Sequence, residues 1–219
     1  MRAGFIRKVY GILSVQLLFT VASSAFFMFH APTRNFVLAN RDGAMFMALA
    51  PFPFLLALYC YKDRHPLNLG LLGGFTACMS YSVGTVCVAV STTQPNGGLL
   101  VLEALILTAT VFVSLTAYVM LSKKDFSFLG GGLFAGLIII IMWSFLSPLM
   151  GFSAGGLSPV FSLVCALLFC GYILYDTSLI LHHFGPDDYI VAAVQLYLDI
   201  INLFLYLLEL LRMLQGGDN

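Results

Sequence analysis

Seven stretches of about twenty mainly apolar residues follow one another along this chain, separated only by short polar or Gly- and Pro-containing breaks. A bilayer core is ~30 Å thick and an α-helix rises ~1.5 Å per residue, so each stretch is long enough to cross a membrane. With 60% hydrophobic and 9% charged residues, the chain is too apolar for a soluble domain of 219 residues. We predict an all-α polytopic membrane protein, a seven-transmembrane-helix bundle that forms one domain over residues 1–219. Its helices are expected near residues 10–29, 44–61, 67–90, 99–121, 128–150, 158–181 and 190–213.

The connections between these stretches are too short to hold another domain. They exclude an extramembrane catalytic domain and a large ligand-binding ectodomain, so we expect no enzyme activity and no catalytic residues. A net charge of zero without a basic patch also excludes nucleic-acid binding. The five cysteines lie inside or at the edges of the apolar stretches without the spacing of a metal site. We interpret them as packing residues and expect no cofactor.

The basic residues are unevenly distributed between the two sides of the predicted membrane protein. Seven of the ten Lys and Arg lie on the side of the amino terminus, and three lie on the other side. Basic loops resist translocation, which predicts a cytosolic amino terminus. Seven crossings then place the carboxyl terminus on the opposite side, whereas a re-entrant last segment would return it to the cytosol.

Two aspartates lie inside the last two apolar stretches, where a charged group costs ~2.5–3.5 kcal/mol. Asp176 lies about five residues from the cytosolic end of one stretch, and Asp199 lies about nine residues into the next. The short loop of residues 182–189 makes the two helices antiparallel neighbours, so the carboxyl groups differ in depth by only about 6 Å. Two carboxylates that meet in a membrane cannot both ionise cheaply. We therefore predict that the pair shares a proton, titrates as a unit and senses pH.

Polar residues recur along one face of the last predicted helix. Intervals of four, three, four and three residues place them in a single stripe, made of Gln195, Asp199, Asn202, Tyr206 and Glu209. A helix with such a stripe belongs at the centre of the bundle. The stripe supplies either interhelical hydrogen bonds that only hold the helices together or a pathway for water and ions. We favour the pathway, because structural hydrogen bonds do not need ionisable groups.

Further charged residues lie at the two ends of the predicted bundle. Arg64, at the cytosolic end of the second predicted helix, is the expected cationic partner of Asp176, with Lys62 as the alternative. Arg64 can equally be an ordinary interfacial anchor. Glu103 and Glu209 both fall toward the opposite face, where they form either a cation-attracting mouth or two separately solvated carboxylates.

The loop between the last two predicted helices carries residues of metal-ligand type: His182, His183, Asp187 and Asp188. The intervening Phe-Gly-Pro sequence indicates a cytosolic turn, and the two aspartates are well placed to cap the start of the next helix. We favour a capped, solvated loop over a metal site.

Five segments of the chain carry specific motifs: Ile6-Arg7-Lys8-Val9-Tyr10, His65-Pro66-Leu67-Asn68-Leu69, Ser122-Lys123-Lys124-Asp125-Phe126-Ser127, Tyr175-Asp176-Thr177 and Leu196-Tyr197-Leu198-Asp199-Ile200-Ile201-Asn202-Leu203-Phe204. In this order, over nearly the whole chain, they resemble the transmembrane BAX inhibitor motif family. The branch that they resemble most holds the Lifeguard and Golgi anti-apoptotic proteins, which include cellular and viral members.

This resemblance implies a seven-helix fold with a central last helix, a pH-sensitive calcium leak from intracellular stores, and suppression of apoptosis. The implied location is the endoplasmic reticulum, the Golgi or the endosomal and lysosomal membranes. The resemblance also implies that Asp176 and Asp199 form the proton sensor, with Arg64 bound to the first, and that calcium, the transported ion, occupies the pair only in transit. An acidic residue that several relatives carry in the second or third helix is missing from those predicted helices. A cation site built on that carboxylate is therefore not expected.

Two other functions fit the same residues. An intramembrane aspartyl protease also places one aspartate after a tyrosine on its sixth helix and another on its seventh, but the Gly-x-Gly context of the second is missing here. A membrane scaffold would act by binding other proteins of cell death or calcium signalling, with any ion leak incidental. We favour the leak channel, with the lipid bilayer, calcium ions and protons as its partners.

Overall fold

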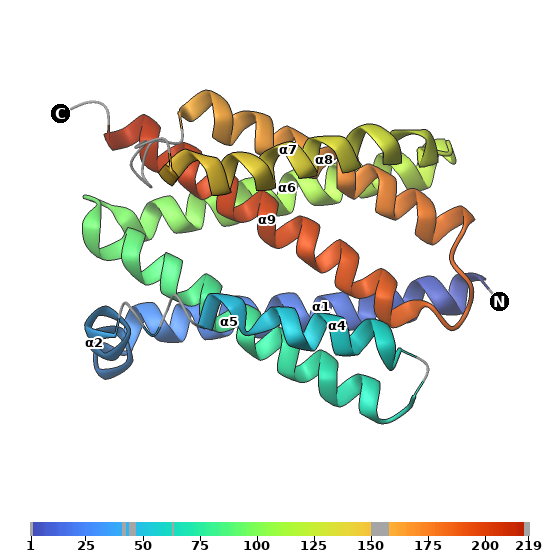
Figure 1. Ribbon diagram of the computed structural model, residues 1–219, viewed down its shortest axis with the longest axis horizontal. Coiled ribbons are helices and arrows are strands. Elements are labelled where there is room, and N and C mark those ends of the chain that lie inside the picture. The colour runs from blue at the N-terminus through green and yellow to red at the C-terminus, as the bar shows by residue number, and fades with distance from the viewer. Residues whose placement is uncertain (1, 41–42, 44–46, 63, 150–157, 217–219) are drawn as a thin grey trace. The chain divides into compact units, whose positions relative to one another are not determined.

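The computed structural model describes residues 2–40, 43, 47–62, 64–149 and 158–216, and no strand occurs among them. The elements are α1 (Arg2–Phe29), α2 (Ala31–Ala39), α4 (Pro51–Cys60), α5 (Leu67–Thr93), α6 (Gly97–Ser122), the 3-10 helix η1 (Ser127–Leu129), α7 (Gly130–Leu149), α8 (Pro159–His182) and α9 (Tyr189–Gly216) (Figure 1). The all-α prediction is confirmed.

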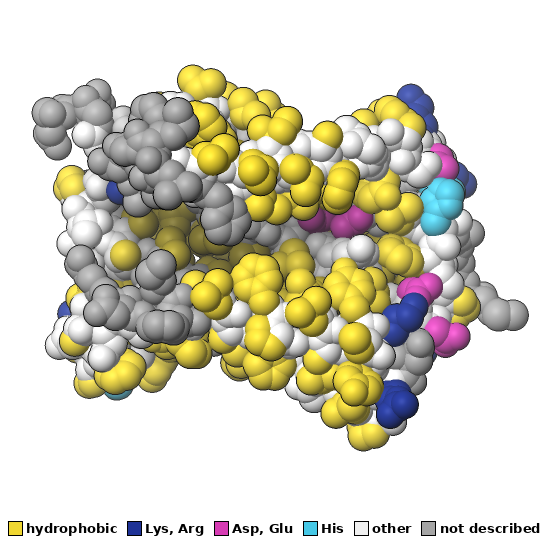
Figure 2. All heavy atoms as spheres, in the orientation of Figure 1, with side chains coloured by type: hydrophobic (Ala, Val, Ile, Leu, Met, Phe, Trp, Pro, Cys, Tyr) yellow, Lys and Arg dark blue, Asp and Glu magenta, His cyan; other side chains and the backbone are white. Residues whose placement is uncertain are grey.

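Among the described residues, six helices are long and apolar enough to cross a membrane: α1, α5, α6, α7, α8 and α9. Their bounds agree with the predicted ones to within three residues, except that α1 begins at Arg2 instead of near residue 10. Hydrophobic side chains cover much of the visible surface (Figure 2), as expected for helices that face lipid instead of water. The chain is a multi-pass membrane protein.

The second predicted crossing, near residues 44–61, corresponds to a shorter apolar helix over Met47–Cys60. Such a helix spans about 21 Å, less than the hydrocarbon core. The chain turns at Ala50, and α4 starts at Pro51, because Pro51 and Pro53 have no N–H for the carbonyl groups before them. Residues 44–46 lie outside the described part of the chain, so a full crossing by this segment stays a prediction.

Helix α2 was not predicted from the sequence. Pro32 lies in its first turn, where a missing N–H costs nothing, and His30 before it has extended backbone angles. The His30 ring stacks on Phe26 with centroids 4.8 Å apart, and its Nδ1 lies 2.7 Å from Thr33 Oγ1. With nine residues, α2 is too short to cross a membrane.

The described chain divides into two compact units. Unit 1 comprises Met1–Val101 and Phe184–Tyr197, and unit 2 comprises Leu102–His183 and Leu198–Asn219. Helix α9 contributes residues to both. Of its apolar window 67% is buried, against 11–44% for the other five long helices, as predicted for a central last helix. Because the two units share α9, this division does not decide the prediction of one domain.

In unit 1, α1 is joined to α5 by buried hydrogen bonds between small polar side chains. The Gln16 Nε2 donates to Thr76 Oγ1 at 3.0 Å, and the Thr20 and Ser80 hydroxyls lie 2.9 Å apart. Thr20 also bonds the Tyr197 hydroxyl of α9 at 2.8 Å. Hydrogen bonds of this kind hold membrane helices together where the hydrophobic effect between them is absent. They fix the first part of α9 against α1.

In unit 2, α7 packs closely on α8 through glycines. A Cβ added at Gly136 would lie 2.6 Å from Leu168, and one at Gly171 would lie 2.7 Å from Leu133. Each glycine therefore accepts a leucine of the opposite helix, which brings the two backbones close together. This packing holds α8, which carries Asp176.

Candidate functional site

The structure brings Asp176 of α8 and Asp199 of α9 together in unit 2. Each is only 5% exposed, and their carboxyl groups lie close enough to interact directly. Ionised carboxylates only accept hydrogen bonds, so a hydrogen bond between the two groups needs a proton on one of them. The short loop between the helices and the similar depth of the two residues produce the pairing. The role of the pair as a proton sensor stays a prediction.

One oxygen of this pair lacks a partner. Asp199 Oδ2 is buried and makes no hydrogen bond to any described residue. Tyr172, one turn before Asp176 on α8, lies within electrostatic reach of both aspartates. Buried polar atoms in proteins normally bond protein groups or ordered water. Asp199 Oδ2 can therefore accept a water molecule or a cation as its partner.

The remaining stripe residues all lie on α9, and the structure gives them different neighbours. Asn202 Nδ2 donates to the Leu198 carbonyl of its own helix at 2.8 Å. The Tyr206 hydroxyl lies close to the Cys165 thiol of α8. Gln195 lies in unit 1, and its Oε1 is buried with no partner among the described residues. The interpretation of the stripe as a pathway stays a prediction.

At the far end of α9, Glu209 is engaged by a cation of its own helix. Arg212 donates to both oxygens of Glu209, from Nε at 2.8 Å and from Nη2. Gln215 Nε2 lies 3.5 Å from an oxygen of Glu103 on α6. This ion pair offsets the charge of Glu209, a contact that the three-residue spacing could have predicted. The cation-attracting mouth stays a prediction.

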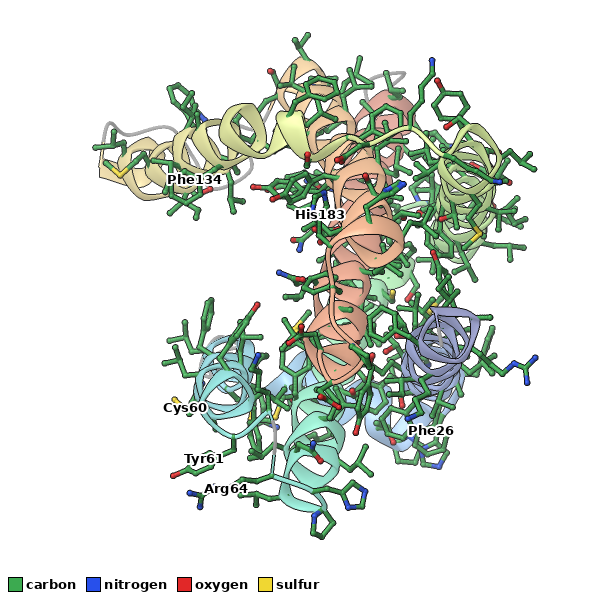
Figure 3. The ribbon with its side chains drawn as sticks, turned by 90° about the vertical axis from the view of Figure 1, so that its right-hand side faces the viewer. Phe26, Cys60, Tyr61, Arg64, Phe134 and His183 are labelled. Carbon is green, nitrogen blue, oxygen red and sulfur yellow. The ribbon has the colours of Figure 1, made fainter. Side chains whose placement is uncertain are left out.

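Arg64 lies in unit 1, in the turn after α4, close to Cys60 and Tyr61 (Figure 3). Its guanidinium carbon is 5.5 Å from the centroid of the Tyr61 ring. The alternative cation, Lys62, donates to Asp188 Oδ1 at 2.8 Å. The predicted pairing of Arg64 with Asp176 stays a prediction.

Asp188 occupies the N-cap position of α9, since its carbonyl accepts from the amide of Ala192 at 3.0 Å. Its carboxylate points away from the helix and accepts hydrogen bonds from the Lys62 ammonium and the Gly185 amide. The Lys62 ammonium, followed by the Gly185 amide, lowers the pKa of Asp188 below its ordinary value. Asp188 therefore caps α9 through its main-chain carbonyl, while its side chain holds the α8–α9 loop through Lys62 and Gly185.

Asp125, which the sequence analysis did not single out, joins the α6–α7 loop to the end of α8. Its Oδ1 accepts from the Ser127 amide at 2.9 Å and from the Ser178 hydroxyl at 3.2 Å. Its Oδ2 lies 3.0 Å from Nε2 of His183. The Ser127 amide, and then His183, hold the pKa of Asp125 well below its usual range. The short Asp-Phe-Ser turn was the only local signal.

Asp125, which is exposed, and Asp188, which is half-buried, do not respond to pH near neutrality. A lowered pKa contributes stability above the unfolded-state value of about 3.9, and that contribution is lost only as the pH falls through the still lower folded-state value. Asp125 and Asp188 therefore stay ionised from pH 5 to pH 8. A pH response in that range has to come from other groups, among which are the buried aspartates.

The attachment of the α6–α7 loop can be tested by hydrogen exchange. The Phe126 amide donates to the Ser178 hydroxyl at 2.9 Å. We expect Ser178→Ala to speed exchange of that amide by about three- to tenfold, since one hydrogen bond has a net value of ~0.5–1.5 kcal/mol. Ser14→Ala, which removes a hydroxyl bonded to its own helix backbone, is the matched control and leaves Phe126 unchanged. Equal exchange in both variants would contradict the attachment.

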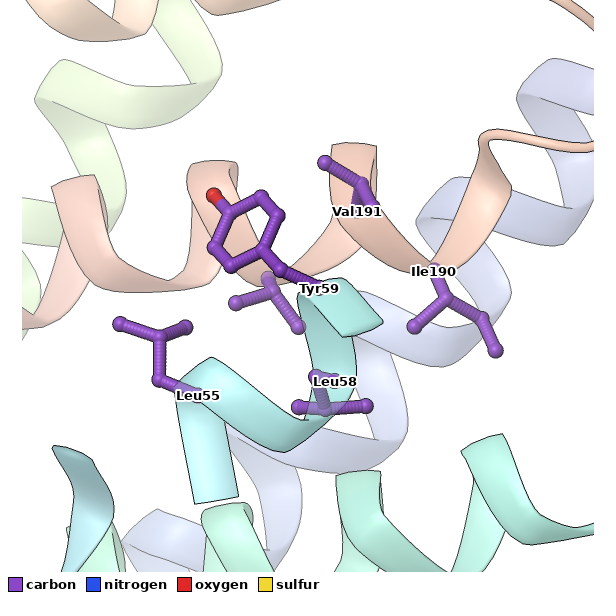
Figure 4. Close-up of a pocket in the computed structure, with 6 residues that line it drawn as sticks. Leu55, Leu58, Tyr59, Ile190 and Val191 are labelled. Atoms are coloured by element: carbon purple, nitrogen blue, oxygen red, sulfur yellow. The ribbon is translucent and has the colours of Figure 1, made fainter. Parts of the chain in front are cut away.

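Unit 1 also contains a small apolar pocket between α4 and the start of α9 (Figure 4). It is lined by Leu55, Leu58, Tyr59, Ile190, Val191 and Val194. Its lining is aliphatic except for Tyr59, and it contains no carboxylate to hold a cation. Within the described part of the chain, no group of three or more His, Cys, Asp or Glu is arranged to hold a metal, the loop of His182 and His183 included.

Comparison with known proteins gives consistent matches. The family model described as "Inhibitor of apoptosis-promoting Bax1" matches residues 2–216. The chain is 45% identical over 223 residues to a BI1-like protein of Arabidopsis thaliana, covering 100% of this chain and 83% of the relative. It is 42% identical over 211 residues to Protein lifeguard 4 of Mus musculus, covering 96% and 85%. It is 40% identical over 213 residues to the Golgi anti-apoptotic protein of Vaccinia virus (strain Lister), covering 96% and 86%.

Proposed function

This chain belongs to the family of inhibitors of apoptosis-promoting Bax1, which confirms the resemblance of its five motif segments, and we propose that it suppresses apoptosis by leaking calcium from an intracellular store. The Asp176–Asp199 pair gates the leak in response to protons. The observation that carries this proposal is the close approach of two buried carboxyl groups inside membrane-spanning helices. Carboxyl groups in such a place are costly and are usually functional.

The chemistry of the pair suits calcium and protons. Carboxylate and amide oxygens are the ligands that calcium prefers, and Asp199 Oδ2 is buried without a partner among the described residues. A proton on the pair removes one negative charge from the path of the cation. Calcium passes the pair without residing there, and Glu103 attracts it at the other end of the path, where Arg212 offsets the charge of Glu209.

The gate works through the charge of Asp176. When Asp176 is ionised, Arg64 pairs with it and holds the helices in the closed arrangement. Lys62 is the weaker candidate for this role, because it already binds Asp188. Protonation of the aspartate pair weakens the attraction to Arg64, so acid opens the leak.

The location follows from the relatives and from the charges. One relative is named a Golgi anti-apoptotic protein, so we place this chain in the Golgi or a related intracellular membrane. The excess of Lys and Arg on the side of the amino terminus supports a cytosolic position of that end. Calcium then leaves the lumen of the store through the protein.

Calcium efflux from proteoliposomes of the purified chain tests the proposal without cellular partners. We expect efflux above that of protein-free liposomes, rising as the pH is lowered from 8 to 5. The expected rise comes from the neutral fraction of the pair. An efflux no greater than that of protein-free liposomes at every pH would reject the channel, and protection from cell death by the same chain would then favour a scaffold. Cleavage of a transmembrane reporter peptide that requires both aspartates would instead favour a protease.

A further inference from the structure

An aromatic stack lies between α8 and α9 in unit 2, on the side of the aspartate pair away from the α8–α9 loop. The rings of Phe169 and Tyr206 are stacked, with centroids 5.8 Å apart and planes at 19°. Phe169 also contacts Tyr172 at 5.8 Å and 32°. The Tyr206 hydroxyl reaches the Cys165 thiol, and Phe169 is only 6% exposed. The stack fills the space between the two helices at this level.

The stack belongs to two matching stripes, one on each helix. On α9 the stripe continues from Asp199 through Asn202 and Tyr206 to Glu209, at intervals of three, four and three residues. On α8 intervals of three, four, three and four residues place another set on one face: Ser162, Cys165, Phe169, Tyr172 and Asp176. The stacking of Phe169 of α8 on Tyr206 of α9 shows that these faces meet. We call this contact between α8 and α9 the seam.

Polar atoms without partners lie on both sides of the stack. Asp199 Oδ2 lies at the aspartate pair, and Ser162 Oγ lies on α8 about 21 Å from Asp176 along the helix. Neither atom bonds any described residue, and Ser162 is fully buried. Polar atoms in such surroundings need water or an ion as a partner. The seam is thus polar at both ends and aromatic in the middle.

We propose that the stack of Phe169, Tyr206 and Tyr172 is a hydrophobic gate that separates two hydrated parts of the seam. This inference rests on the proposed leak function and adds to it a second constriction, distinct from the proton sensor. An apolar constriction blocks ions by excluding water, and it opens when the rings separate. The aspartate pair determines the pH at which the leak opens, and the stack determines how little calcium leaks in the closed state.

Cys165 is a natural reporter of this gate, because its thiol lies against Tyr206. The test uses a chain in which Cys60, Cys78, Cys87 and Cys170 are alanine, leaving Cys165 as the single thiol. A charged, membrane-impermeant methanethiosulfonate reagent is added to proteoliposomes, and the labelling rate is measured. We expect Phe169→Ala to raise the rate by roughly tenfold or more, because both ring contacts of Phe169 are lost.

A matched control removes a ring from the same helix outside the seam. Phe161 contacts Trp143 of α7, with centroids 6.3 Å apart. Phe161→Ala should leave the labelling of Cys165 at the parental rate. Phe169→Trp, which restores an aromatic ring, should return the rate toward that of the parent. Should Phe169→Ala aggregate on size exclusion, Phe169→Leu carries the same test, since it keeps apolar volume without a ring.

Calcium efflux gives the second readout. At pH 8, Phe169→Ala should leak more than the parent, while the pH of half-maximal efflux stays the same. Unchanged labelling of Cys165 in both Phe169→Ala and Phe169→Leu would overturn the gate, whatever the efflux. Faster labelling in a chain whose parent transports no calcium would support the hydrated seam and reject the leak function, so the two failures are distinguishable.

Discussion

We expect the Asp199→Asn variant to leak calcium at the same rate from pH 5 to pH 8, whereas the leak of the parent rises as the pH falls. Asparagine has nearly the shape of aspartic acid but binds no proton, and its amide donates to Asp176, which favours the ionised form of Asp176 throughout this range. One shared proton changes the ratio of neutral to ionised pairs by at most about tenfold per pH unit. The substitution removes that whole dependence. The measurement is efflux from proteoliposomes at matched protein density.

Three further variants locate the response. Asp176→Asn should flatten the pH profile as Asp199→Asn does, because the two groups titrate together. Asp125→Asn is the matched control: its carboxylate is exposed and stays ionised in this range, so the parental profile should survive. Parental profiles in both buried variants would reject the sensor. If His182→Gln combined with His183→Gln then flattened the profile, the loop histidines would be the sensor.

The second large effect concerns the turn between α5 and α6. A Cβ added at Gly97 would lie 2.3 Å from the carbonyl oxygen of Val90 and 2.7 Å from Cα of Ser91. Both are backbone atoms of α5 and cannot rotate away. Asn96 before it already has a positive φ of 61°, so the turn has little freedom to adjust. We expect Gly97→Ala to destabilise the protein by about 3 kcal/mol, the upper end of overpacking effects.

The neighbouring glycine provides a matched control for this prediction. A Cβ at Gly98 would meet no atom within 4 Å. Gly98→Ala should therefore be neutral or stabilise the start of α6, since alanine exceeds glycine in helix propensity by ~1 kcal/mol. Thermal unfolding in detergent, with size exclusion as a check of dispersity, compares the two variants. Equal melting temperatures would contradict the close approach of α6 to the end of α5.

The long helices were predictable because apolar length alone determines which segments can cross a membrane. The structure has features that the length of an apolar run does not predict, namely a short helix and an interruption within one run. Helix α2 is short and mixed in polarity, and only Pro32 in its first turn indicated it. The turn at Ala50 comes from Pro51 and Pro53, which have no N–H to continue the helix hydrogen bonds. Their effect is local and does not depend on the apolar run around them. Apolar runs do not show where a helix is interrupted.

The aspartate pair was predictable because a short loop fixes α8 and α9 as antiparallel neighbours and sets the depth of each residue. The contact of Asp125 with His183 was not, since it joins residues 58 positions apart across the end of α8. Only tertiary structure brings such groups together. The pair of Glu209 and Arg212 is different: its spacing is local, and it could have been predicted.

Infrared difference spectroscopy tests most directly whether Asp176 and Asp199 share one proton. The parent at neutral pH should show the carbonyl stretch of a protonated carboxyl group, and both Asp176→Asn and Asp199→Asn should remove or shift that band. Asp125→Asn should leave it unchanged. A spectrum without any protonated carboxyl band, or a band that neither buried variant alters, would contradict the shared proton and with it the proposed gate.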